Sequence, residues 1–190
     1  MIACMGSLGL DANSTNSWRT RKNARELRGV KPRIWLPNLM EQGQLPNERD
    51  FDPYHGDLDA QCAWKHFGGL TLEHAQAKFL ENPECYQEDF MFMGGKAFAY
   101  YFPVIEDYLK SVPEGFHHND DHQAWIISHC IKLQFEREDL LHVRHLIPRV
   151  IALADYVRRN LDRFGSDEER DVATAWSELI QHVRTVDRKA

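Results

Sequence analysis

The segment 138–162 spaces its apolar residues three and four apart, and this pattern restricts the fold more than any other feature of the chain. Because an α-helix makes one turn in 3.6 residues, the spacing places these side chains along one side of a helix. Pro148 lies inside the pattern and predicts a kink. The apolar positions are Leu140, Val143, Leu146, Ile147, Val150, Ala154, Val157 and Leu161.

Similar signals divide the chain from Asp57 onward into further helices. Glycine pairs and prolines separate the segments, and Ser166 with Glu169 matches a capping box that begins the last helix. Pro103 predicts a kink in its own segment. The segment that ends near Phe135 is apolar nearly all round, which indicates a central helix. The expected helices, besides 138–162 and the last one, are 57–67, 71–81, 85–93, 96–112 and 120–135.

The predicted fold class is all-α, an irregular multi-helix array or bundle of about six to seven helices. No internal repeat and no convincing strand pattern occurs in the sequence. Residues 34–56 contain three prolines and two glycines without a sustained period. We therefore expect an irregular N-terminal segment that lies over the helical domain.

Charge divides the chain into a basic arm, residues 1–33, and a single acidic domain, residues 34–190. The arm carries seven Lys or Arg and two Asp or Glu, so its net charge is +5, whereas the whole chain has −6. The arm is predicted to be flexible because it is polar and poor in aliphatic residues. The alternatives are a helix that binds an acidic partner and a stretch that lies upstream of the natural domain.

Composition limits the classes of partner. The acidic balance argues against general binding to nucleic acid or to an anionic membrane. No apolar run reaches the length of a membrane span. The four cysteines are scattered without a CxxC motif, which indicates a reduced, cytoplasmic protein.

The segment 86–109 contains the candidate site, an acidic pair among aromatic residues. The favoured interpretation is structural: the pair Glu88 and Asp89 organises the junction between two short helices and accepts hydrogen bonds. A second interpretation is a partner-binding surface, since Tyr, Phe and Met anchor interfaces. A third makes Glu88 a general base or metal ligand. The candidate residues are Tyr86, Glu88, Asp89, Phe92, Tyr100 and Tyr101.

A pattern over residues 64–109, about a quarter of the chain, carries a resemblance. Its first part is His66, Phe67, Gly69, Thr71, Leu72, Glu73 and Ala75, its second is Tyr86 with Glu88 to Gly94, and its third is Ala97, Phe98, Tyr100, Tyr101, Phe102 and Pro103. With these residues the chain resembles a family of uncharacterised bacterial proteins. Gly95 stands where that pattern often has proline. The family has no assigned activity, so the resemblance implies a likeness of fold and no catalytic residue.

Histidines form a second group of candidates. His118 and His122 are four residues apart, which places both imidazoles on one helix face beside Asp121, as metal sites need. If the helices 120–135 and 138–162 pack antiparallel, three more histidines come to one level. These are His129, His142 and His145. The spacing matches no established zinc pattern, so we predict no metal and no cofactor. Zinc or another transition metal would use these six residues if a site formed.

No motif in the sequence names a reaction, since neither a GxSxG nor a complete phosphate-binding loop occurs. The prediction is a non-enzymatic, cytoplasmic bacterial protein that binds a protein partner, in the manner of an immunity protein or antitoxin. Self-association is a further kind of interaction to consider. The alternative is a metal-dependent hydrolase that uses the His/Asp group. A third hypothesis makes the basic arm a tether to the partner.

Overall fold

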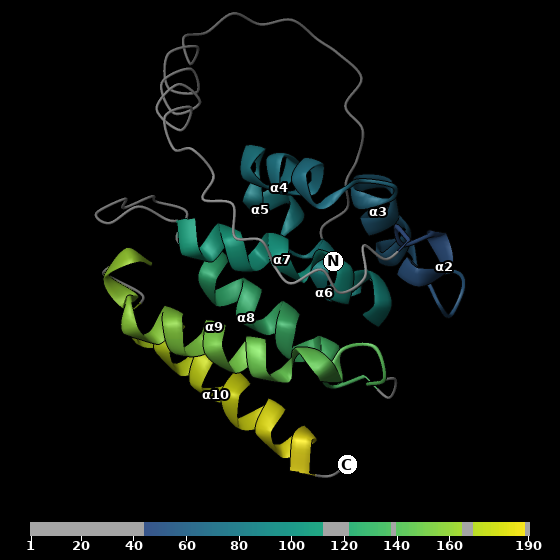
Figure 1. The fold of residues 1–190 in the computed structure, drawn as a ribbon. Coiled ribbons are helices and arrows are strands. Elements are labelled where there is room, and N and C mark those ends of the chain that lie inside the picture. Colours follow the sequence, from purple (N-terminus) through teal and green to yellow (C-terminus); the bar gives the residue numbers. More distant parts are fainter. Residues whose placement is uncertain (1–43, 112–121, 138–139, 165–168, 189–190) are drawn as a thin grey trace, which may run out of the picture. The chain divides into compact units, whose positions relative to one another are not determined.

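The computed structural model describes residues 44–111, 122–137, 140–164 and 169–188 (Figure 1). All of them belong to the compact unit Gly43–Ala190. The predicted basic arm, residues 1–33, lies outside the described residues. So do His118, Asp121, Ser166 and the side chain of His122.

The described residues form helices and contain no strand, which confirms the all-α prediction. The elements in chain order are α2 (Glu48–Phe51), α3 (Leu58–Phe67), α4 (Leu72–Glu81), α5 (Pro83–Tyr86), α6 (Asp89–Phe92), α7 (Gly95–Ser111), α8 (His122–Gln134), η2 (Arg144–Leu146), α9 (Ile147–Arg159), η3 (Leu161–Arg163) and α10 (Glu169–Arg188), where η marks a 3-10 helix.

Two predicted helices differ from the observed ones. The segment 85–93 is divided into α5 and α6, because Asn82 caps α5 through the backbone N–H of Cys85 and a turn at Gln87 and Glu88 follows. The helix predicted over 138–162 begins only at Ile147. Pro148 therefore stands in its first turn, where a missing N–H costs nothing. The kink predicted at Pro148 was wrong, whereas Pro103 does lie inside α7.

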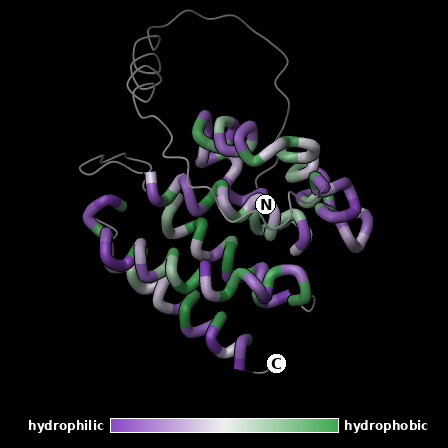
Figure 2. The backbone as a smooth tube through the Cα atoms, in the orientation of Figure 1, coloured by the Kyte–Doolittle hydropathy of each residue, from purple (hydrophilic) through white to green (hydrophobic). Residues whose placement is uncertain are grey.

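The C-terminal helices pack together, with α10 against both α8 and α9 (Figure 1). Figure 2 shows α9 and α10 as alternating hydrophobic and hydrophilic bands, as expected for helices buried on one side. The buried face of α10 is the predicted one and includes Trp176, Leu179 and Val183. The Trp176 indole donates a hydrogen bond to the carbonyl of Ala124 on α8 at 2.9 Å.

The N-terminal helices pack on the other elements of the unit, α4 on α7 and α6 on both α3 and α8. Their core is aromatic, with edge-to-face pairs such as Phe67 with Phe90 and Phe79 with Phe90. Two leucines of these helices are exposed, Leu58 at 75% and Leu80 at 48%. Leu58 is the first residue of α3, and Leu80 is the second-last residue of α4.

Gly94 allows the backbone of α2 to approach the connection between α6 and α7. Its N–H donates to the carbonyl of Phe51 at 2.7 Å. A Cβ atom at this position would lie 2.4 Å from the carbonyl oxygen of Asp50 and 2.9 Å from a carbon of Pro53. No side chain larger than hydrogen fits without moving α2.

We therefore expect Gly94→Ala to reduce the free energy of unfolding by about 3 kcal/mol, at the upper end of overpacking costs. Urea denaturation monitored by circular dichroism measures the change. The control is Gly69→Ala, whose added methyl meets nothing within 4 Å but whose φ is +74°. That variant should lose only about 1 kcal/mol to backbone strain. Equal losses would contradict the steric explanation.

Candidate functional site

The structure separates the two members of the acidic pair. Asp89 is only 8% exposed, and its Oδ2 lies 2.8 Å from Nδ1 of His66 on α3. Glu88 is exposed and makes no side-chain cap to α6. The neighbouring carboxylates therefore differ, since Asp89 is buried and Glu88 is exposed. Of the two residues, Asp89 has the structural role, because its contact with His66 joins α6 to α3.

Tyr86 covers the pair formed by Asp89 and His66. Its ring lies edge-on to the His66 imidazole with centroids 5.2 Å apart, and the Lys78 ammonium lies 5.1 Å from the Tyr86 centroid. Burial raises the pKa of Asp89 to about 6, against the opposing effect of His66. An Asp–His pair of this kind orients an imidazole for proton transfer. His66 and Asp89 line neither of the two cavities described below.

The other predicted aromatic residues have different roles. Tyr101 is buried, and its hydroxyl donates to the carbonyls of Phe67 at 2.6 Å and Leu70 at 2.8 Å, which fixes the connection between α3 and α4. Burial raises its pKa well above the ordinary value. Tyr100 is half-buried and its ring lies against that of Tyr101, with centroids 4.8 Å apart. Only Phe92, of the six predicted site residues, lines a described cavity.

Two side chains at the end of α8 bind the carbonyls of α6 and of the turn that follows it. The Gln134 amide lies within hydrogen-bond distance of the carbonyls of Phe90 and Met93, both at 2.8 Å, and of Met91 at 3.1 Å. The Arg137 guanidinium donates to Met91 at 2.7 Å and to Met93 at 3.2 Å. We call these two residues and residues 90–93 the carbonyl clamp.

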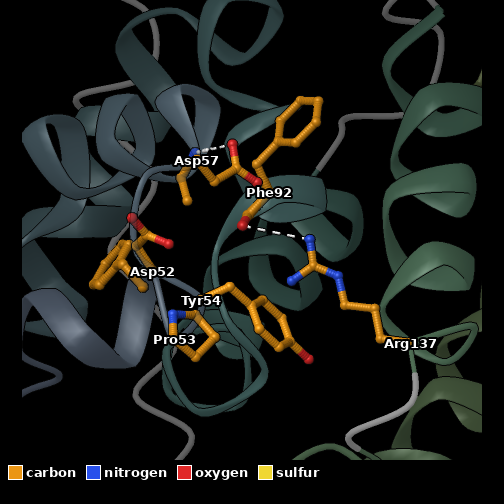
Figure 3. A pocket seen from close by; sticks show the side chains of 8 residues that line it. Asp52, Pro53, Tyr54, Asp57, Phe92 and Arg137 are labelled. Atoms are coloured by element: carbon orange, nitrogen blue, oxygen red, sulfur yellow. Dashed lines mark hydrogen bonds between the residues drawn. The ribbon is translucent and has the colours of Figure 1, made fainter.

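Arg137 also lines a cavity of about 460 Å³ beside the connection between α2 and α3 (Figure 3). Figure 3 shows Asp52 and Asp57 on one side of this cavity and Arg137 on the other. Burial lowers the pKa of Arg137, and the nearby Asp57 opposes that shift. The cavity therefore has opposite charges on two walls. Its lining is Phe51, Asp52, Pro53, Tyr54, Asp57, Ala60, Phe92 and Arg137.

The turn between α2 and α3 holds Asp52 beside this cavity. Asp52 is 6% exposed, and its Oδ2 accepts a hydrogen bond from the Gly56 N–H at 2.7 Å. This bond lowers the pKa of Asp52. His55 has a φ of +59°, and Gly56 has +109°. The N–H groups of the turn thus fold back over the carboxylate.

Sequence reasoning did not find Asp52, Tyr54 or Arg137. The segment DPYHGD, residues 52–57, was assigned to an irregular segment because of its proline and glycine. Asp, Pro and Gly are typical turn residues, and an aspartate side chain can bond to the backbone of its own turn. Nothing in the sequence indicated that Arg137 would reach the same place, because the contact depends on the packing of α6 on α8.

The histidines do not assemble into a metal site within the described part of the chain. Among those residues, no group of three or more His, Cys, Asp or Glu side chains is placed to hold a metal ion. His129 lies against Trp125, with ring centroids 4.4 Å apart, and His145 is exposed beyond α8. His142 belongs to the turn before η2. His129 therefore makes a packing contact with Trp125.

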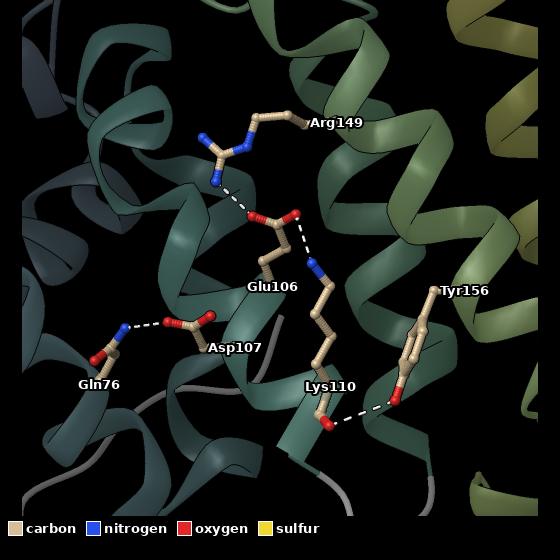
Figure 4. A network of polar contacts seen from close by, with 6 residues as sticks. All are labelled: Gln76, Glu106, Asp107, Lys110, Arg149 and Tyr156. Carbon is tan, nitrogen blue, oxygen red and sulfur yellow. Dashed lines mark hydrogen bonds and ion pairs between the residues drawn. The ribbon is translucent and has the colours of Figure 1, made fainter. Parts of the chain in front are cut away.

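A third polar group, on α7, connects helices and does not line either cavity (Figure 4). Glu106 pairs with Lys110 at 3.0 Å and with Arg149 of α9. Gln76 of α4 donates to Asp107, whose pKa is raised by burial. Ion pairs that involve such exposed side chains contribute little to the free energy of unfolding. The network links α4 and α9 to α7.

The fold and the site define an all-α protein with a charged cavity beside a tight turn. Every helix in the described part of the chain is too short or too polar to span a lipid bilayer. Comparison with family models, with curated proteins and with solved structures gave no match to this chain.

The raised pKa of Asp89 makes stability depend on pH. Its ordinary value is 3.8 and its folded value about 6, so the folded state binds the proton more tightly than the unfolded state. The free energy of unfolding should therefore fall as pH rises from about 4 to about 6, by on the order of 2 kcal/mol from this group.

Asp89→Asn removes this contribution, so the variant should gain stability relative to the wild-type protein as pH rises through this window. Urea denaturation at a series of pH values from 4 to 7 measures the difference. Glu88→Gln, which removes the exposed neighbouring carboxyl, controls for net charge. A difference between Asp89→Asn and wild type that stays constant over the series would contradict the prediction.

Proposed function

We propose that this protein is non-enzymatic and acts by binding a protein partner through the α2–α3 surface. This surface consists of Tyr54, Leu58 and the cavity of about 460 Å³ beside them. One observation carries the proposal: Tyr54 is 71% exposed and Leu58 is 75% exposed, on the two sides of a turn that is itself well fixed. Large apolar side chains that remain in water next to a cavity are typical of binding surfaces.

The composition of the surface suits a protein partner. Tyrosine and arginine are the residues most often found to dominate binding energy, especially when they adjoin a pocket. Tyr54 provides a large contact area with few rotatable bonds, and Arg137 is held in place by the carbonyls of Met91 and Met93. Arg137 therefore does not have to be ordered when a partner binds, which reduces the entropic cost of association.

The charge of the chain favours a basic partner. The net charge is −6, although residues 1–33 contribute +5. A negative domain attracts a basic effector protein and can cover its active surface. The proposal therefore includes a role as an immunity protein or antitoxin in the bacterial cytoplasm.

The test combines affinity capture with surface variants. Full-length protein is immobilised, and proteins retained from host lysate are quantified by mass spectrometry for wild type, for the double variant Tyr54→Ala/Leu58→Ser and for Leu80→Ser. Leu80 is a matched control because it is an exposed leucine on α4, away from the cavity. A specific partner should be retained by wild type and by the control. The double variant should weaken its binding about tenfold or more.

Purified partner then gives the dissociation constants by calorimetry, with circular dichroism to confirm that each variant is folded. Deletion of the gene should sensitise host cells to the partner when the partner is a toxin. A stoichiometric partner that binds the double variant as tightly as wild type would refute the proposed surface. The absence of any stoichiometric partner would refute the function.

A further inference from the structure

Helix α8 is apolar nearly all round, yet one of its faces remains in water. A helix of this kind is normally covered on every side by the fold. The inward face of α8 is covered, since Ile127, Cys130 and Ile131 are fully buried. On the other face, Trp125 is 39% exposed and Leu133 is 37% exposed. Two large apolar side chains of this central helix are therefore only partly covered by the chain.

The exposed residues of α8 form a ridge. Trp125, His129 and Leu133 follow one another at intervals of four residues. Side chains four residues apart on an α-helix lie one above the other, and such rows are the ridges by which helices pack. The His129 ring lies against that of Trp125, with centroids 4.4 Å apart. Trp125 and Leu133 are thus the apolar positions of one ridge, with His129 between them.

The ridge ends at the α2–α3 surface. After α8 the chain keeps turning, since the Glu136 N–H donates to the carbonyl of Leu133 at 3.2 Å. The residue four positions beyond Leu133 is Arg137, which lines the cavity of about 460 Å³ together with Tyr54. Backbone carbonyls of α6 and of the turn that follows it hold the Arg137 guanidinium there. Arg137 therefore connects the ridge with the α2–α3 surface.

The size of a protein interface requires more contact area than the α2–α3 surface offers. A specific interface covers about 800 Å² and about 20–30 residues on each partner, whereas two exposed side chains and a cavity lined by eight residues make up that surface. A second cavity, of about 330 Å³, does not extend it with apolar contacts. Its lining is Glu48, Arg49, Asp52, His55, Gly56 and Gln61. The ridge of α8 provides the apolar extension.

The charges beside the ridge favour basic groups. Glu136 and Glu178 of α10 are both exposed, and each has a carboxylate oxygen 3.9 Å from the Lys132 ammonium. Two carboxylates around one ammonium leave a net charge of one negative unit. A complementary surface therefore has apolar side chains in its centre and lysine or arginine at its edge.

From this ridge and its connection to the cavity, we infer that the protein partner places an amphipathic helix along α8, with its apolar side chains on Trp125 and Leu133. The ridge on one helix fits the groove between side chains of another, and helices recognised in this way present apolar residues at such intervals. This inference deepens the proposed function and rests on it for the existence of a partner. Trp125 is the anchor of the contact, because tryptophan is among the residues that most often dominate binding energy.

The first experiment uses wild-type, full-length protein and the partner purified after affinity capture. Hydroxyl radicals oxidise accessible side chains, and mass spectrometry measures the oxidation rate of each residue in the free and the bound protein. We expect oxidation of Trp125 and Leu133 to slow severalfold on binding, together with that of Tyr54. Leu80 is the control because it is an exposed leucine on α4, and its rate should not change.

Variants measure the energetic contribution of the ridge. Trp125→Ala and Leu133→Ser should each weaken binding of the purified partner about tenfold, as determined by calorimetry. Leu80→Ser should leave the dissociation constant unchanged. Thermal melting followed by circular dichroism confirms that each variant is folded. If Trp125→Ala does not fold, the oxidation rates of the wild-type protein decide the question without it.

Two results overturn the inference. Equal oxidation rates of Trp125 and Leu133 in the free and the bound protein would place the partner elsewhere. Oxidation of Trp125 that speeds up when the free protein is diluted, together with a dimer in sedimentation velocity, would show that a second copy of the chain covers the ridge.

The outcomes separate this inference from the proposed function. A partner whose binding depends on Tyr54 and Leu58, without protection of Trp125 and Leu133, removes the inference and leaves the function. Protection of Trp125 in a complex that Tyr54→Ala/Leu58→Ser does not weaken supports the ridge and refutes the α2–α3 surface. The absence of any stoichiometric partner removes both.

Discussion

The carbonyl clamp is the interaction on which the arrangement of the described helices depends. The short helix α6 ends at Phe92, so the carbonyls of residues 90–93 have no further helical turn to supply N–H donors and find donors elsewhere. Gln134 and Arg137 supply these donors from more than 40 residues away along the chain. Each buried carbonyl without a donor would cost on the order of 1–3 kcal/mol. The position of α6 on α8 is therefore fixed by polar contacts as well as by the aromatic core.

The cavity follows from the same contacts. Arg137 donates to the carbonyls through both terminal nitrogens of its guanidinium and also lines the cavity (Figure 3). On the opposite side, Gly94 lets α2 approach closely enough for the Gly94 N–H to donate to the carbonyl of Phe51. That approach carries the following residues, Asp52 to Tyr54, to the cavity wall. The Arg137 contacts on one side and the approach of α2 on the other thus place the two charged walls of the cavity.

The buried carboxylates of Asp52 and Asp89 show how their surroundings decide their roles. Asp89 has a side-chain partner, His66, but burial dominates and raises its pKa. Asp52 has a backbone partner, Gly56, which lowers its pKa and leaves one oxygen without a donor. The first carboxylate is used within the fold. The second holds the turn between α2 and α3 through the Gly56 N–H.

The sequence by itself determined the helical class and most helix positions, because apolar spacing and the residues that begin and end helices are local signals. It missed the division of α5 from α6, the late start of α9, and the different fates of Glu88 and Asp89, because each depends on what packs against the segment. Only the tertiary structure brought Asp52, Phe92 and Arg137 to one cavity. These residues come from distant segments, and no local pattern records which backbone carbonyls a distant side chain must satisfy.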